Sequence, residues 1–164
     1  MKPSPVTIAD PRTVALDPAP IRREWVLAGA PVAASAVIAR SRDGTSVTIA
    51  WACTPGAFRW YFGVDETVHI IAGEVFIADD VGGPERRLGP GDVAFFPAGT
   101  WQAWRVTQPL RKLAVCRHAM PRVCGFALRG FNNLAALARG MPTGTLVAKP
   151  AAGEPALAIV TPAK

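Results

Sequence analysis

"GPGDVAFFPAGTWQAW", residues 89–104, places two turns around a short apolar strand. A Gly-Asp pair comes before the strand and a Pro-Ala-Gly corner follows it, and residues of these types reverse or bend a chain. The stretch then enters a second strand that carries Trp101, Gln102 and Trp104. Because successive side chains of a strand point to opposite faces, Gln102 and Trp104 share one face and Trp101 lies on the other. The stretch therefore predicts paired strands with one amide on an apolar face.

The composition of the whole chain agrees with a β-rich domain. The chain has 164 residues, of which 50% are apolar and 18% are charged, so we expect one packed domain rather than a disordered chain. Its 15 glycines and 16 prolines favour many turns and few long helices. Turn signals recur about every ten residues, as in a sandwich or barrel. The predicted fold class is all-β.

The positive charge of the chain does not indicate nucleic-acid binding. The formal net charge is +6, yet basic residues occur at most in pairs, as at Arg22-Arg23, Arg86-Arg87 and Arg111-Lys112. No stretch combines dense basic charge with stacking aromatic residues. A solvated positive surface explains the charge, and a few basic residues that face a pocket for a small anion would also fit.

The sequence predicts a cytoplasmic protein without a membrane segment. The N-terminus has no apolar core typical of a signal peptide, and the small-apolar stretch 28–39 is too short to span a bilayer. The cysteines at positions 53, 116 and 124 form neither an even set nor a CxxC pair. We therefore expect free thiols in a reducing compartment.

The chain divides into three predicted regions. Residues 1–31 contain six prolines and are expected to form an extended arm, with Trp25 as its anchor on the domain. Residues 32–119 carry the predicted strands of the barrel. Residues 120–164 form a C-terminal extension with a short helix near 131–139, where an asparagine cap and a terminal glycine enclose strong helix formers.

Within the barrel region, turn residues separate the predicted strands. The Arg-Asp-Gly turn at 42–44 predicts a hairpin between 32–40 and 45–54. The stretch 66–79 looks like two strands that meet at Gly73, where a residue without a Cβ would permit a tight reversal. The further predicted strands cover 57–62, 93–96, 101–109 and 110–119.

Four stretches together resemble a known family. They are "WACTPGAFRW" (51–60), "DETVHIIAGEV" (65–75), "LGPGDVAFFPAG" (88–99), and Trp104 followed seven residues later by Arg111-Lys112. In combination they resemble a single-domain cupin, similar to the small cupins related to ureidoglycine aminohydrolase. The resemblance implies a double-stranded β-helix, or jelly-roll barrel, that forms a homodimer and holds its pocket inside one mouth of the barrel.

The resemblance also implies a metal site, of which this chain keeps only part. Metal-binding cupins supply two histidines and a glutamate from their first motif and one histidine from their second. Aligned on the motif glycines and proline, the glutamate falls on Glu66, while the histidine positions fall near Trp60 and Phe62 and on Gln102. Transition metals prefer three or four donors that include nitrogen or sulfur. We therefore expect no firmly bound cofactor, although Glu66 and Gln102 could hold a divalent ion such as manganese weakly.

The two histidines of the chain do not complete such a site. His69 lies three residues after Glu66, so strand alternation points it to the opposite face, where an outer-surface or dimer-interface position is expected. His118 lies at a strand end with the parity of Lys112 and Cys116. No ligand spacing supports a metal role for His118.

Glu66 is the candidate catalytic residue, with two interpretations open. A carboxylate inside an apolar barrel could act as a general acid or base. Alternatively, Glu66 pairs with a basic neighbour, Arg59 or Lys112, and only stabilises the barrel. Gln102 is expected to hydrogen-bond a ligand or Glu66, because a buried amide needs partners.

The tryptophans give a second set of candidates. Four of them could line a pocket for a flat or apolar molecule, or could simply pack the core, and strand parity favours two as pocket residues. The predicted ligand-binding residues are Arg59, Trp60, Phe62, Gln102, Trp104 and Lys112.

Three functions remain open from the sequence. The first is a cupin with a degenerate metal site that binds a small polar or anionic metabolite. The second is an enzyme of the ureidoglycine aminohydrolase type, or a related isomerase or lyase, that depends on Glu66. The third is a structural or regulatory dimer in which the barrel is only a scaffold, because a fold does not fix a function.

Overall fold

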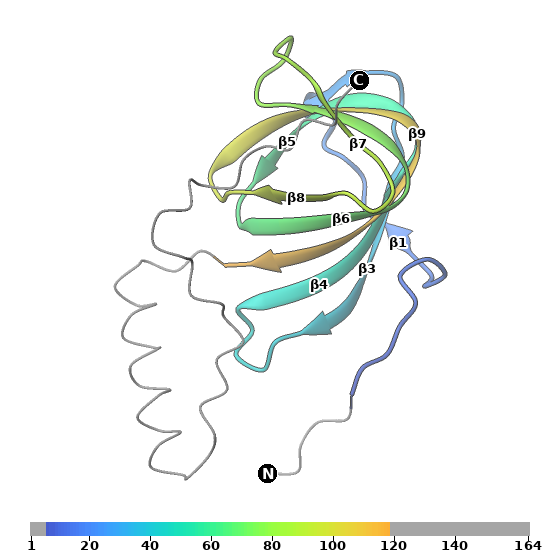
Figure 1. Ribbon diagram of the computed structural model, residues 1–164, viewed down its shortest axis with the longest axis vertical. Coiled ribbons are helices and arrows are strands. Elements are labelled where there is room, and N and C mark those ends of the chain that lie inside the picture. The colour runs from blue at the N-terminus through green and yellow to red at the C-terminus, as the bar shows by residue number, and fades with distance from the viewer. Residues whose placement is uncertain (1–5, 119–164) are drawn as a thin grey trace. The chain divides into compact units, whose positions relative to one another are not determined.

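The computed structural model describes residues 6–118, which form a curled antiparallel sheet (Figure 1). This architecture confirms the predicted all-β barrel. No helix in residues 6–118 has the length and apolar character needed to cross a membrane. The strands of this range are β1 (Asp17–Pro18), β2 (Val26–Ala28), β3 (Ala33–Arg40), β4 (Ser46–Cys53), β5 (Gly56–Phe62), β6 (Asp65–Ala78), β7 (Arg86–Leu88), β8 (Val93–Phe96) and β9 (Thr100–Arg117).

The strand β9 is the centre of the sheet. Its first half pairs with β5 and its second half with β4, while β6 runs along most of its other edge. The sequence predicts two strands here, but Pro109 lies inside one continuous strand of 18 residues. Pro109 is exposed and lies beside a register shift of β6, so its missing N–H leaves no gap in a regular ladder. One long strand thus brings residues from three neighbouring strands together.

The predicted hairpin at 42–44 is confirmed. Strands β3 and β4 pair antiparallel on either side of this turn. The Asp43 carboxylate accepts hydrogen bonds from the Ser41 hydroxyl at 2.5 Å and from the Thr45 amide at 3.1 Å. These bonds lower the pKa of Asp43 to about 2, so the turn is held by an ionised carboxylate.

The predicted reversal at Gly73 is wrong. Strand β6 continues through this position and only shifts register against β9 between Ile70 and Val75. Gly73 is required for a different reason: its φ is +84°, and a Cβ there would lie 2.1 Å from the Pro109 carbonyl oxygen. The glycine therefore allows two long strands to cross closely while both stay continuous.

The described part of the N-terminal region, residues 6–31, adds the two outermost strands to the order β1-β3-β4-β9-β5-β2. Strand β1 pairs with β3, and β2 pairs with β5. Between them, a 3-10 turn at Arg23–Trp25 carries Trp25, which packs against the buried core. The predicted extension 120–164, with its helix near 131–139, lies outside the described residues.

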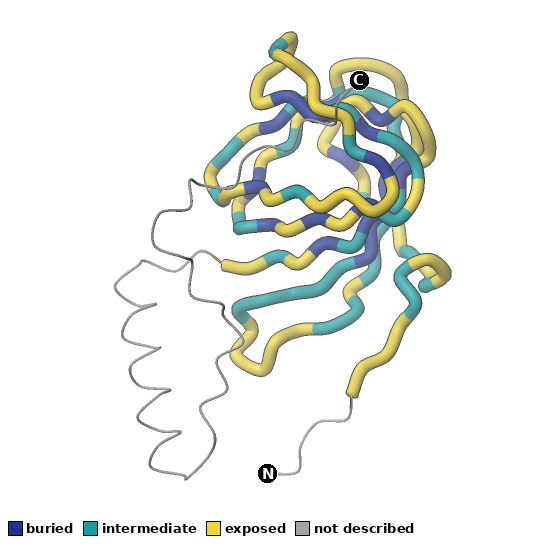
Figure 2. Tube along the Cα trace, viewed as in Figure 1, coloured by how far each residue is buried: buried dark blue, intermediate teal, exposed yellow. Residues whose placement is uncertain are grey.

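Burial follows strand alternation, and buried positions gather around the interior of the barrel (Figure 2). In β6, Glu66, Val68 and Ile70 are buried whereas His69 is exposed, so the predicted outward orientation of His69 is confirmed. In β9, the tryptophan at position 101 is 42% exposed and the one at position 104 is 2% exposed. The face assignment made from the sequence is therefore confirmed for both strands.

Candidate functional site

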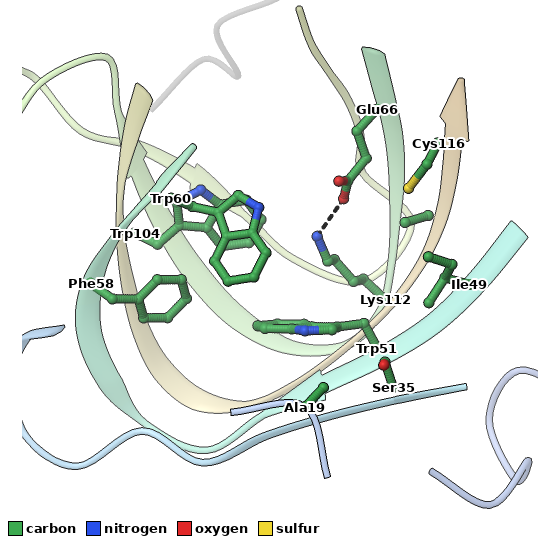
Figure 3. Close-up of a pocket in the computed structure, with 11 residues that line it drawn as sticks. Ala19, Ser35, Ile49, Trp51, Phe58, Trp60, Glu66, Trp104, Lys112 and Cys116 are labelled. Atoms are coloured by element: carbon green, nitrogen blue, oxygen red, sulfur yellow. Dashed lines mark hydrogen bonds and ion pairs between the residues drawn. The ribbon is translucent and has the colours of Figure 1, made fainter. Parts of the chain in front are cut away.

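A cavity of about 190 Å³ lies inside the curled sheet. Its walls are mostly apolar, and they include three tryptophans and one phenylalanine (Figure 3). The cavity is smaller than the roughly 300–1,000 Å³ typical of pockets for drug-sized ligands, which suits a small molecule. The lining residues are Ala19, Ser35, Ile49, Trp51, Phe58, Trp60, Glu66, Trp104, Lys112, Ala114 and Cys116.

A buried ion pair forms the polar part of the wall. The Nζ of Lys112 donates a hydrogen bond of 2.7 Å to the Oε1 of Glu66. The side chains of Lys112 and Glu66 are 7% and 10% exposed. Lys112 lies opposite Ile70, four residues from Glu66 along β6, so its long side chain runs along the sheet to reach the carboxylate. Of the two partners predicted for Glu66, Lys112 is the one that forms the ion pair in the structure.

Two indole rings flank the Lys112 ammonium group. Its Nζ lies 4.9 Å from the ring centroid of Trp51 and 4.7 Å from that of Trp104. The negative face of an aromatic ring attracts a cation, and this attraction strengthens when water is excluded. The ammonium is therefore held by one carboxylate and two rings, on the wall of the cavity.

The aromatic side of the cavity is built from adjacent strands. Trp60 and Phe58 project from β5, with ring centroids 6.2 Å apart, and Trp60 meets Trp51 edge-on at 6.3 Å. Behind Trp60, Trp25 from the N-terminal region makes a second edge contact at 5.5 Å. These contacts fix the orientation of the tryptophan that the sequence selects as a pocket residue.

Cys116 lines the cavity beside Glu66, on the side that faces Trp60 and Phe58 (Figure 3). The pKa of the Cys116 thiol is raised to about 11. Burial is the main cause, and the negative charge of Glu66 and a hydrogen bond to Glu66 also raise this pKa. The thiol therefore stays protonated at neutral pH and adds a weak donor rather than a thiolate to the cavity.

Two predicted ligand-binding residues lie elsewhere. Arg59 is exposed, and its guanidinium stacks over Trp101 at 4.9 Å, because odd-numbered positions of β5 face outward. Phe62 faces inward but stacks on Phe96 of β8, with ring centroids 4.5 Å apart. Neither residue lines the cavity, so contact of Arg59 or Phe62 with a ligand stays a prediction.

Gln102 is buried opposite Trp60 but does not line the cavity either. Among the described residues it makes no hydrogen bond to Glu66, and its Oε1 has no partner. The indole N–H of Trp104, two residues along the same face of β9, is also buried without a partner. An unpaired buried polar group costs about 1–3 kcal/mol, so these two atoms are available to bond a further molecule.

The residues present do not fit the metal site that the cupin resemblance implies. Trp60 and Phe62 offer no donor atom, Glu66 is engaged by Lys112, and Gln102 lies outside the cavity. Residues 6–118 contain no group of three or more His, Cys, Asp or Glu side chains that could hold a metal ion. We therefore derive no chemistry through a metal.

Several lining residues were not singled out by the sequence reasoning. Phe58 and Ala114 each lie two residues from a predicted pocket residue, Trp60 and Lys112, on the same strand. Strand alternation therefore places them on the same face, and the sequence contained the signal for both. Ser35 and Ala19 come from β3 and the N-terminal region, and only the tertiary arrangement brings them to the cavity.

Comparison with known proteins relates the barrel to a known family. Residues 40–114 match the family model of the EutQ-like cupin domain. This part of the barrel is therefore similar to a cupin domain. The matched range begins at the last residue of β3 and ends within β9, so it contains Glu66 and Lys112 but not the N-terminal strands. The match does not extend to the ureidoglycine aminohydrolase-like branch, which stays a prediction.

One solved structure supports the cupin fold. A protein of unknown function from Pseudomonas syringae pv. tomato, of the DUF861 family, is 21% identical over 64% of this chain and 45% of its own, with a TM-score of 0.58. This chain thus spans less than half of that protein. The Clostridium difficile EutQ protein is 20% identical over 54% of this chain and 70% of its own, with a TM-score of 0.48.

A third solved structure matches a smaller share of this chain. A DUF861 family protein from Thermotoga maritima is 31% identical over 40% of this chain and 73% of its own, with a TM-score of 0.37. No curated protein matches the sequence. The comparisons therefore establish the fold, and the chemistry has to be argued from the cavity.

Proposed function

We propose that the cupin barrel binds a small polar or anionic metabolite in its cavity. The observation that carries this proposal is the Lys112–Glu66 ion pair on the wall of a tryptophan-lined space. Ligand sites combine mostly apolar walls with a few fixed polar groups that orient the ligand. Here the ammonium and carboxylate supply donor and acceptor, and the indole rings supply flat apolar contact.

The size and charge of the cavity restrict the ligand. A space of about 190 Å³ admits a small molecule and not a polymer. The pair is neutral in total, so a ligand that carries a carboxylate can bond to Lys112 while its other groups meet Glu66 or the rings. The unpaired Gln102 and Trp104 atoms offer one acceptor and one donor nearby in the same strand.

A thermal-shift screen with small carboxylates, zwitterions and neutral amides tests the proposal. A bound ligand at about 100 times its Kd stabilises the folded state by about 2.7 kcal/mol, so the unfolding midpoint rises by several degrees. The variant Trp60→Ala should lose the shift. Trp101→Ala is the matched control, because Trp101 also contacts Trp25 but lies on the outer face. No shift with any compound would favour a purely structural role.

The second candidate is a Glu66-dependent enzyme of the ureidoglycine aminohydrolase type. The presence of Glu66 at the cavity supports it, and the absence of nitrogen donors among the predicted ligands speaks against its metal. Elemental analysis separates the two. One equivalent of a divalent metal that is lost in Glu66→Ala would reject the metal-free proposal, whereas substoichiometric metal supports it. The homodimer and the cytoplasmic location stay predictions.

A further inference from the structure

Lys112 is the only lysine in the described part of the chain. The other lysines of the sequence, at positions 2, 149 and 164, lie outside residues 6–118, where every other basic residue except histidine is arginine. Arginine is generally preferred for buried ion pairs, because its guanidinium is weakly hydrated and bonds carboxylates through two N–H groups. A lysine has one property that arginine lacks, namely a primary amine that can lose its proton and act as a nucleophile.

The surroundings of Lys112 supply what such a nucleophile needs. Its Nζ lies 2.7 Å from Glu66 Oε1, within the range of direct proton transfer. Its side chain is 7% exposed and opens on the cavity of about 190 Å³. An amine, a proton acceptor and space for a reactant therefore meet at one point, enclosed by apolar walls (Figure 3).

We propose that Lys112 forms a Schiff base with a small aldehyde or ketone that occupies the cavity, with Glu66 as the proton carrier. This inference rests on the proposed function, because the carbonyl compound has to bind in the same cavity. It narrows the ligand from any small polar metabolite to one with a reactive carbonyl group.

The reaction balances without a further reactant. Glu66 accepts a proton from the Lys112 ammonium, and the freed Nζ electron pair forms a bond to the carbonyl carbon while the C=O π bond opens. Proton transfer through Glu66 gives a neutral carbinolamine. A second proton from Glu66 to its hydroxyl group then releases water as the C–O bond breaks. The product is a protonated imine paired with the Glu66 carboxylate, so aldehyde or ketone plus ammonium yields iminium plus water.

The aromatic walls favour this product. The iminium cation takes the place of the ammonium between the rings of Trp51 and Trp104, where a positive charge is already stabilised. Apolar walls also limit the access of water, which would hydrolyse the imine. Neither effect requires a movement of the backbone.

Reductive trapping tests the proposal on the full chain. The protein is incubated separately with pyruvate, glyoxylate and benzaldehyde in the presence of sodium cyanoborohydride, and labelled peptides are located by mass spectrometry. We expect the Lys112 peptide to gain the mass of at least one carbonyl compound less one oxygen atom. Labelling of Lys112 should be at least about tenfold faster than labelling of the lysines at 2, 149 and 164, because Glu66 serves Lys112 as a proton carrier.

Two variants define the roles of the pair. Lys112→Arg retains a cation for Glu66 but has no nucleophile, so label at position 112 should vanish while the other lysines react as before. Glu66→Gln retains Lys112 but removes the proton carrier, and trapping at Lys112 should slow by about 100-fold. Circular dichroism checks that each variant is folded, and the wild-type result stands even where a variant is not.

The outcomes separate this inference from the proposed function. If all three compounds leave Lys112 unlabelled while non-carbonyl ligands raise the unfolding midpoint, the Schiff base is rejected and ligand binding stands. If neither labelling nor a midpoint shift occurs, both are rejected. Equal labelling rates at Lys112 and the other lysines, or an unchanged rate in Glu66→Gln, would also overturn the assigned chemistry.

Discussion

At the scale of single residues, the Lys112–Glu66 pair is the costly element of the cavity. Taking two charges out of water is unfavourable, and the pair is kept only because each group satisfies the other. Sequence reasoning was enough to place Glu66 inside the barrel and to name two candidate partners for it. It was not enough to choose Lys112 over Arg59 as the partner of Glu66, because that choice depends on how β6 and β9 lie beside each other.

The stability costs of removing the two members of the pair should therefore not be additive. Lys112→Met leaves a buried carboxylate without its counter-charge, and we expect the free energy of unfolding to fall by about 3–5 kcal/mol. Glu66→Gln should also destabilise the protein, whereas the double variant should lose less than the sum of the two single changes. Urea denaturation of all four proteins measures this coupling. Additive losses would show that the two groups do not interact.

The reactivity of Cys116 gives an independent test of the charge of Glu66. With a pKa of about 11, the thiol stays protonated at pH 8, and alkylation should be slow and accelerate as the pH rises toward 11. Glu66→Gln removes the negative charge that raises this pKa, so Cys116 should react faster at the same pH. Iodoacetamide labelling followed by peptide mass spectrometry gives the rate.

Cys53 is the matched control for that experiment. Burial also raises its pKa to about 11, but Glu66 is not among the causes. The labelling rate of Cys53 should therefore stay the same in Glu66→Gln. A parallel change at both cysteines would instead indicate that the variant has loosened the barrel.

At the scale of elements, local sequence signals predicted the short connections and missed the long strands. The turn at 42–44 and the outward side of β6 follow from residue types and alternation. Strands β6 and β9 were each divided in the prediction, at Gly73 and at Pro109, because glycine and proline usually interrupt strands. In the structure these residues lie at the same close crossing, so each makes sense only in the presence of the other strand.

Gly73→Ala tests the importance of this crossing. The new Cβ would lie 2.1 Å from the Pro109 carbonyl oxygen, on a backbone with a φ of +84°. We expect a loss of more than about 3 kcal/mol or a failure to fold, because both the strain and the clash involve backbone that cannot move freely. The loss is measured by thermal and urea denaturation.

Gly44→Ala provides the comparison for Gly73→Ala. Gly44 also has a positive φ, +70°, but nothing lies within 4 Å of its Cβ position. This variant should lose only about 1 kcal/mol, from backbone strain alone. Similar losses in the two variants would mean that the contact with Pro109 contributes nothing.

At the scale of the whole molecule, the N-terminal region closes the edges of the barrel. Strands β1 and β2 cover β3 and β5, and the Arg111 guanidinium donates hydrogen bonds of 2.7 Å to the carbonyl oxygens of Pro11 and Val14. The sequence predicted an extended arm there, but the strand pairing depends on distant partners and left no local signal.

Removal of residues 1–28 should therefore expose two sheet edges. Unpaired N–H and C=O groups on β3 and β5 offer a template for pairing with another chain, so we expect the truncated protein to aggregate. Light scattering during heating measures this, with the full chain as reference. A truncated protein that remains monodisperse at the same temperature would show that β1 and β2 do not protect these edges.

The central position of β9 also bears on how the protein is made. Strand β9 carries Lys112 and Trp104 and pairs with β4, β5 and β6, and it leaves the ribosome after every other strand of residues 6–118. Until then the inner faces of the earlier strands have no cover, and the pairings that bury them join segments far apart along the chain. Such non-local closure is slow and exposes nascent chains to misassembly. The cavity with its ion pair is therefore completed late in folding, in the same step that completes the sheet.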